Sequence, residues 1–227
     1  MTKIRRTFAV AFAAGTTLVA SPALAVPTSF TAVGEAQTWD HGKSTTVPNT
    51  LYYQRGKIRL EMAAPVSAEG VAPFNVVLAQ EGGKTITLLN PKEKQAMKLE
   101  ISNLDELAEN QSLQKISQFK LSEFATTFKN QSTASGHETV AGEPCTIREH
   151  KGKDGHFKMW LADSHQIPFK FVYFDKGKPA FAWQVNRFTA SASLPASSFA
   201  VPAGYETTDL SEMLKGVDLD VKHFENR

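Results

Sequence analysis

Gly56-Lys57-Ile58-Arg59-Leu60-Glu61-Met62 alternates charged and apolar side chains after its first glycine. In an extended chain, side chains that alternate with a period of two point to opposite faces. Together with the preceding Leu51-Tyr52-Tyr53-Gln54-Arg55, the stretch therefore predicts β-structure with one face buried and the other in water. Because similar runs recur along the chain, this pattern decides the fold class.

Further short runs are rich in apolar, β-branched or aromatic residues and are bounded by glycine, proline or asparagine. Runs of this kind are typical of successive antiparallel strands. We expect strands at residues 74–79, 85–89, 96–99, 145–150, 156–161, 169–174 and 180–189.

The connection at residues 151–155 contains two glycines and predicts a hairpin. If His150 pairs with His156 across it, most apolar side chains of the two strands share a face. The other pairs expected in this register are Glu149 with Phe157, Ile147 with Met159, and Cys145 with Leu161.

Residues 102–130 contain neither glycine nor proline and carry apolar side chains at helical spacing, which predicts a helix. A shorter helix is expected at residues 208–215. The order of strands, helix and strands predicts a mainly β, α+β fold, in which helices gather on one face of a large antiparallel sheet.

The N-terminus has the order of a secretory signal: basic residues up to Arg6, an apolar run at residues 8–20, and small residues at Ala23 and Ala25. A transmembrane anchor is the alternative, but the run is about 13 residues long, whereas a span needs roughly 20. We expect residues 1–25 to be a signal peptide cleaved before Val26. Residues 26–227 would then form a single soluble domain in the periplasm of a Gram-negative bacterium.

Removal of the signal also changes the charge balance. The whole chain has 25 basic and 23 acidic residues, and three of the basic ones lie in the signal, which leaves 22 against 23, a net charge of −1. A nearly neutral protein lacks the excess of basic residues that binds the phosphate backbone of nucleic acids, so we expect no nucleic-acid partner. The single cysteine excludes an internal disulfide.

The sequence contains no recognisable catalytic constellation, so we expect a protein that is not an enzyme and has no cofactor. There is no Gly-x-Ser-x-Gly, and residues 137–141 lack the second histidine of a zinc peptidase helix. His150 and His156 would form only a weak metal pair, and we expect them to mark a solvated hairpin end. Cys145 lies in an apolar pattern and is expected to be a buried structural side chain.

The strand faces carry many methionine and aromatic side chains, which adapt to acyl chains of variable shape. These residues are our candidates for an apolar ligand-binding face, and the alternative is an ordinary core between sheet and helix. The candidates are Ile58, Leu60, Met62, Ile86, Leu88, Met97, Phe157, Met159, Phe169, Phe171 and Trp183.

Several short motifs occur in an order similar to that of one known group of proteins. They are residues 56–62, 83–91, 142–145, 159–162, 167–168 and the closing Ser198-Phe199-Ala200-Val201-Pro202-Ala203-Gly204-Tyr205. With these motifs the chain resembles the LolA/RseB-like superfamily of periplasmic proteins, which includes the outer-membrane lipoprotein carrier.

The resemblance implies a strongly curved antiparallel sheet that forms an incomplete barrel, with helices covering its concave face and a cavity for acyl chains between them. It also implies a cell-envelope protein that binds a lipid or an acylated protein without catalysis. The alternative on the same fold is a protein-interaction or stress-sensor domain. The carrier uses an arginine of an early strand, and Arg59 is the nearest match, but alternation places Arg59 opposite Ile58, Leu60 and Met62. The oligomeric state stays open.

Overall fold

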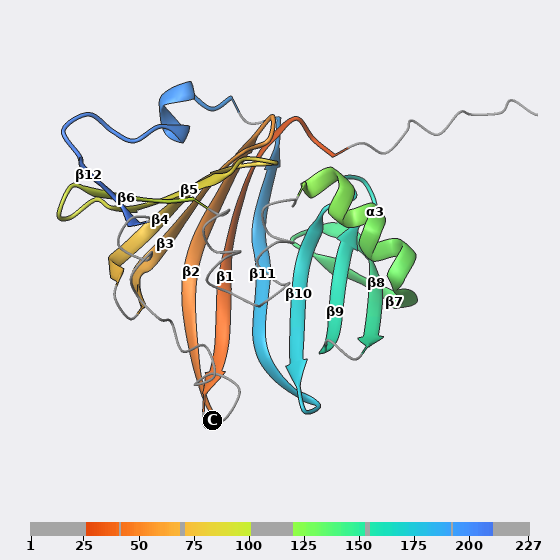
Figure 1. The fold of residues 1–227 in the computed structure, drawn as a ribbon. Helices are drawn as coiled ribbons and strands as arrows, with labels where there is room; N and C mark the ends of the chain where they lie inside the picture. Colours follow the sequence, from red (N-terminus) through yellow and green to blue (C-terminus); the bar gives the residue numbers. More distant parts are fainter. Residues whose placement is uncertain are drawn as a thin grey trace, which may run out of the picture.

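The computed structural model describes residues 26–40, 42–68, 71–100, 120–152, 155–191 and 193–210. In this part of the chain, twelve strands form one sheet in the order β12-β6-β5-β4-β3-β2-β1-β11-β10-β9-β8-β7. Neighbouring strands are antiparallel except β12, which runs parallel to β6. Figure 1 shows that the sheet is strongly curved and does not close. The predicted mainly β fold with a large, unclosed antiparallel sheet is confirmed.

The elements follow one another in short steps along the chain. Their bounds are β1 Ser29–Asp40, β2 Lys43–Gln54, β3 Lys57–Ala68, β4 Val71–Gln80, β5 Thr85–Asn90, β6 Gln95–Glu100, α3 Leu121–Gln131, β7 Thr133–Val140, β8 Glu143–Gly152, β9 Gly155–Ala162, β10 Pro168–Asp175, β11 Lys178–Ala190, η1 Ala196–Phe199 and β12 Glu206–Asp209.

The strand in the middle of the sheet, β1, was not among the predicted ones. Its buried side carries Ala32 and Gly34, whose small side chains give no strong apolar alternation. A Cβ atom on Gly34 would lie 2.2 Å from the carbonyl oxygen of Gln184, so the approach of β11 requires glycine there. The first half of β2 and all of β7 were also missed, because both are mostly polar and exposed.

The hairpin of β8 and β9 has a register one residue away from the prediction. Gly152 pairs with Gly155, which leaves only two residues between the strands, and Lys151 pairs with His156. Because a one-residue shift turns each side chain to the other face, His150 and His156 lie on opposite faces. Thus Glu149 pairs with Lys158, Ile147 with Trp160 and Cys145 with Ala162.

The two histidines therefore cannot share a metal ion. Within the described ranges, no three histidine, cysteine or acidic side chains come close enough together to hold one.

One helix, α3, packs on the sheet in the part of the chain that the structure describes. Phe128 contacts the buried pair Met159 and Leu161 on β9, together with Phe171 on β10. Figure 1 shows α3 lying over β8, β9 and β10. Helical cover is thus supported only at this end of the sheet, and the rest of the predicted helix at residues 102–119 lies outside the described residues.

The C-terminus of α3 is bound by an arginine of the sheet. The Arg148 side chain donates hydrogen bonds to the carbonyl oxygens of Lys129 and Ser132, at 2.8 and 2.6 Å. A cation stabilises this end of a helix because the last carbonyl groups lack partners within the helix. Arg148 is therefore already engaged, although it lies on the sheet face that α3 covers.

The short helix predicted at residues 208–215 is wrong at its start. Thr208 and Asp209 belong to β12, which adds to the edge of the sheet beside β6. The backbone hydrogen bonds of β6 outweigh the local helical pattern at these positions. Leu210 then packs against Leu88 and Met97. Residues 211–215 lie outside the described residues, as do the proposed signal peptide and its cleavage site.

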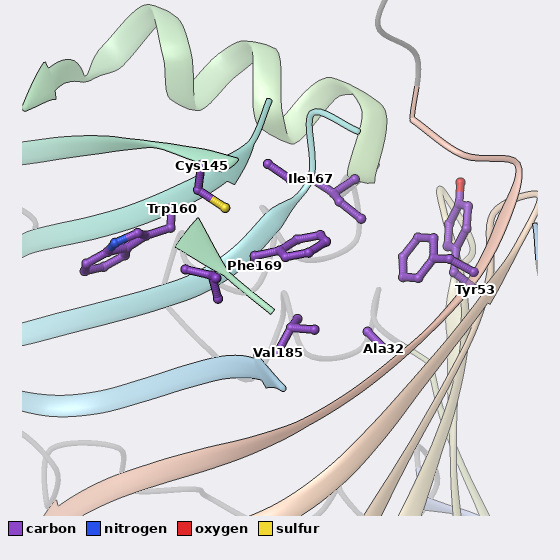
Figure 2. Packing of buried hydrophobic residues seen from close by; sticks show 10 residues of the cluster. Ala32, Tyr53, Cys145, Trp160, Ile167, Phe169 and Val185 are labelled. Carbon is purple, nitrogen blue, oxygen red and sulfur yellow. The ribbon is translucent and has the colours of Figure 1, made fainter. Parts of the chain in front are cut away.

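The largest buried cluster joins residues from both halves of the chain. Figure 2 shows Ile167 and Phe169 between Cys145 and Trp160 on one side and Ala32 and Val185 on the other. A second cluster, built on Val76, Leu78, Leu89 and Ala96, is covered by Val201 and Tyr205 of the C-terminal segment. None of the described helices is both long enough and apolar enough to cross a membrane.

Candidate ligand-binding face

All eleven candidate residues lie on one face of the sheet. Paired residues of neighbouring strands share a face, as do alternate residues within a strand. The pairs that show it are Leu60–Val77, Val77–Leu88, Leu88–Met97, Gly34–Asn49, Asn49–Met62, Ala36–Trp183, Trp183–Phe171 and Phe171–Met159. We call this surface the helix face, because Phe128 of α3 contacts Met159 on it.

The candidate residues differ in how deeply they are buried. Leu88, Met97, Met159 and Phe169 are buried. The others are half-buried: Ile58, Leu60, Met62, Ile86, Phe157, Phe171 and Trp183. Eight of the eleven belong to three clusters, centred on Phe169, on Leu88 with Met97, and on Met159 with Leu161. The structure thus brings them to one face without packing them into one core.

A buried polar pair lies between the two halves of the helix face. Trp183 on β11 donates a hydrogen bond from Nε1 to Oδ1 of Asn49 on β2, at 3.0 Å. Asn49 is 6% exposed, and among the described residues it is the one buried side chain that is polar. The intervening strand β1 carries Gly34 and Ala36 on this face, and these small residues leave room for the indole to reach β2.

The sequence reasoning missed Asn49. Asn49 is two residues from Leu51 and four from Tyr53, and alternate residues of a strand share a face, so Asn49 lies on the apolar side of β2. This spacing could have identified it from the sequence.

Arg59 lies on the opposite face, which confirms the argument from alternation. Its Nε atom is 2.6 Å from Oε1 of Glu61, and its Nη1 atom donates to the carbonyl oxygen of Ser198 at 3.0 Å. Arg59 therefore holds η1 against the outside of the sheet, and it does not face the helix side.

A groove of about 390 Å³ lies along β9, β10, β11 and β1, mostly on the face opposite the helix face. We call it the outer groove. Apolar, aromatic, amide and charged side chains line it. The lining residues are Glu35, Gln37, Trp39, Lys158, Trp160, Lys170, Val172, Phe174, Pro179, Ala182, Trp183 and Gln184.

One end of the outer groove is a compact polar network. The Lys170 ammonium lies 4.4 Å from the centre of the Trp160 ring and 3.3 Å from Oε1 of Glu138. The other carboxylate oxygen of Glu138 accepts a hydrogen bond from Nε1 of Trp160 at 2.5 Å. This network orders both side chains, and Trp39, Phe174 and Trp183 are further half-buried aromatic groups that line the groove.

Cys145 is 1% exposed, and its Sγ donates to the carbonyl oxygen of Glu143 at 3.4 Å. Burial raises the pKa of the thiol to about 11. At neutral pH the sulfur therefore stays protonated, and a protonated thiol is neither a nucleophile nor a good metal ligand. This agrees with a structural role.

Comparison of the sequence with protein-family models and with curated proteins finds no match. Comparison of the fold with solved structures finds an uncharacterized conserved protein from Thermus thermophilus, with a TM-score of 0.51 and 10% identity, covering 81% of this chain and 91% of that one. This chain therefore shares its overall fold with that protein. Similarity this low in sequence describes the fold alone.

A LolA superfamily protein and a MucA/MucB complex are also among the similar structures. The LolA superfamily protein NE2245 from Nitrosomonas europaea has a TM-score of 0.35 and 12% identity, covering 78% of this chain and 92% of that one. The MucA/MucB complex of Pseudomonas aeruginosa gives a TM-score of 0.47 and 15% identity over 79% of this chain. This chain spans 58% of that matched chain.

Proposed function

We propose that this chain is an exported periplasmic protein whose helix face binds an apolar ligand, the acyl chain of a lipid or of an acylated protein, without catalysis. The proposal includes a signal peptide at residues 1–25 and a single LolA-like domain at residues 26–227. It also takes the helix face as the hollow side of the curved sheet, where helices cover a ligand.

The observation that carries the proposal is that half-buried apolar side chains from several neighbouring strands all lie on the helix face. In a filled core these side chains would be buried as completely as Met159 and Phe169, which are 1% and 0% exposed. Instead, residues such as Met62 and Phe171 keep part of their apolar surface uncovered. An acyl chain that covers this surface gains roughly 25 cal/mol per Å² of apolar area removed from water.

The test compares two adjacent side chains on opposite faces of β10. Phe171 and Val172 are both half-buried, but Phe171 lies on the helix face and Val172 lines the outer groove. In a titration with a pyrene-labelled C16 acyl probe, we expect Phe171→Ala to weaken binding at least tenfold and Val172→Ala to leave it within twofold. A wild-type protein that does not bind the probe, or equal effects of the two variants, would contradict the proposal.

A second function, binding of an envelope protein as an interaction or sensor domain, is favoured by one specific feature, the outer groove. Tryptophan is enriched where protein interfaces gain most of their binding energy, and charged residues are common at interface rims. Trp39 supplies such an aromatic group in the groove that the charged Lys158 and Glu35 also line.

The two functions are separated by Trp39→Ala. If the protein-binding function holds, wild-type protein forms a cross-link to a partner protein in envelope extracts, and Trp39→Ala does not. Binding of the acyl probe should be unchanged in Trp39→Ala. Loss of probe binding in Trp39→Ala, with the cross-link retained, would contradict this assignment of the groove.

A further inference from the structure

We propose that Asn49 binds the carbonyl oxygen of the ester or amide group that joins an acyl chain to the rest of its ligand, so that the helix face selects neutral acyl derivatives over free fatty acids. This inference rests on the proposed function, because it names the chemistry that the same face recognises.

The hydrogen bond from Trp183 determines how the Asn49 amide is oriented. An indole N–H can only donate, so the Asn49 atom facing it at 3.0 Å must be the oxygen. The amide nitrogen therefore points away from Trp183. It donates to the carbonyl oxygen of Val47, two residues away on the same strand, at a long 3.4 Å.

The nitrogen of Asn49 carries two N–H groups, and the long contact to Val47 uses one of them. The second has no acceptor among the described residues. A buried donor without a full partner costs free energy, which an incoming acceptor recovers. Asn49 is 94% buried, since 6% of it is exposed, and its side chain lies on the helix face.

The position of Asn49 suits the polar junction of an acylated ligand. Its cross-strand partner on β3 is Met62, and the next residue of this row across β1 is Val185 on β11. Phe171 lies on β10, three strands from Asn49, which corresponds to about 14 Å across the sheet. An acyl chain that extends from Asn49 towards β10 therefore covers Phe171 and has its carbonyl end at Asn49.

The charge around Asn49 distinguishes a neutral carbonyl from a carboxylate. The residues that pair with Asn49 or continue its row are Met62, Gly34 and Val185, and none carries a charge. Arg148 lies on the helix face but donates to the carbonyl groups at the end of α3. Among these described residues, a carboxylate buried beside Asn49 would find no cation to pair with, whereas an ester or amide oxygen needs only the free N–H.

The experiment uses three pyrene-labelled C16 probes of equal chain length: the free acid, its methyl ester and the hydrocarbon without a carbonyl group. The full chain is titrated with each at pH 7.5. We expect the wild type to bind the ester at least tenfold more tightly than the acid. We also expect it to bind the ester about fivefold more tightly than the hydrocarbon, the size of one added hydrogen bond.

The variant is Asn49→Leu combined with Trp183→Phe, which removes both hydrogen-bonding partners and leaves no buried indole N–H unpaired. We expect this double variant to bind the ester and the hydrocarbon within twofold of each other, so the ratio of the two affinities is the measured quantity. Trp183→Phe alone keeps Asn49 but removes the hydrogen bond that orients its amide, so its preference for the ester should lie between those of the wild type and the double variant.

Two results overturn the inference while the proposed function stands: equal wild-type binding of ester and hydrocarbon, or a preference for the ester that persists in the double variant. Failure of the wild type to bind any of the three probes overturns the proposed function and the inference together.

Discussion

Truncation of two methionines on the helix face separates a ligand-binding surface from a plain core. Met159 is 1% exposed and packs with Leu161, Phe128 and Phe171. Its replacement by alanine leaves a cavity in a filled region, where Met→Ala typically costs roughly 2–5 kcal/mol, and we expect about 3 kcal/mol. Met62 is half-buried and pairs with Asn49.

The expected loss for Met62→Ala is smaller, because the exposed part of its side chain has no packing partner to lose. Removing about three methylene-sized groups at roughly 0.8 kcal/mol each, with about two thirds of that area buried, gives about 1.6 kcal/mol. If the ligand covers the exposed part of the Met62 side chain, Met62→Ala also removes an apolar contact with the ligand. Binding of the C16 ester probe should then fall severalfold.

The assay pairs urea denaturation, followed by tryptophan fluorescence, with the probe titration on the same samples. Wild-type protein is the reference, and Met97→Ala is a further control, because Met97 is 5% exposed and should behave like Met159. The reasoning is refuted if Met62→Ala loses as much stability as Met159→Ala while it binds the probe as well as the wild type does.

Four other measurements test the account at separate places. Cys145→Ser should keep probe binding within a few-fold and lower the free energy of unfolding by roughly 1 kcal/mol or more, because a hydroxyl replaces a buried thiol; lost binding at unchanged stability would point to thiol chemistry. The pKa of Cys145 rises from 9.0 to about 11 on folding, so the unfolded chain loses its proton first. The free energy of unfolding should therefore fall as the pH rises above about 9, more steeply in wild type than in Cys145→Ala, and equal slopes in denaturation series would contradict this. Arg59→Gln should loosen η1 and speed proteolysis near Ser198 without changing probe binding, which limited proteolysis with mass analysis can check, and an unchanged cleavage pattern would count against that role. Intact-mass measurement of the exported protein should find Val26 as its first residue, and retention of Met1 in the envelope fraction would contradict the signal peptide.

Strong alternation made part of the fold predictable. The charged and apolar residues of β3 identify the strand and its faces. The register confirms that Arg59 and Leu60 lie on opposite faces of the sheet. The same pattern was absent from β1, where close packing against β11 requires Gly34. A strand of this kind has no local pattern of its own, because its small residues are required by contacts with strands that are distant in the sequence.

Register and polar details required the structure. In the β8–β9 hairpin, both possible registers place apolar residues on a common face, and the pairing of Gly152 with Gly155 decides between them. Asn49 escaped notice because its partner, Trp183, is distant in the sequence. The outer groove was missed for a similar reason, since it joins side chains of four strands from both ends of the chain.

The central claim, that the helix face binds an acyl chain, is tested most directly by mass spectrometry of lipids retained by the purified wild-type protein. The full chain is produced with its own N-terminal segment, recovered from the periplasm without detergent, and extracted with organic solvent beside the Phe171→Ala variant. The account predicts ester- or amide-linked acyl species in near-stoichiometric amount from the wild type, and much less from Phe171→Ala. A wild-type protein that yields no acyl species, even after incubation with phospholipid vesicles, would contradict it.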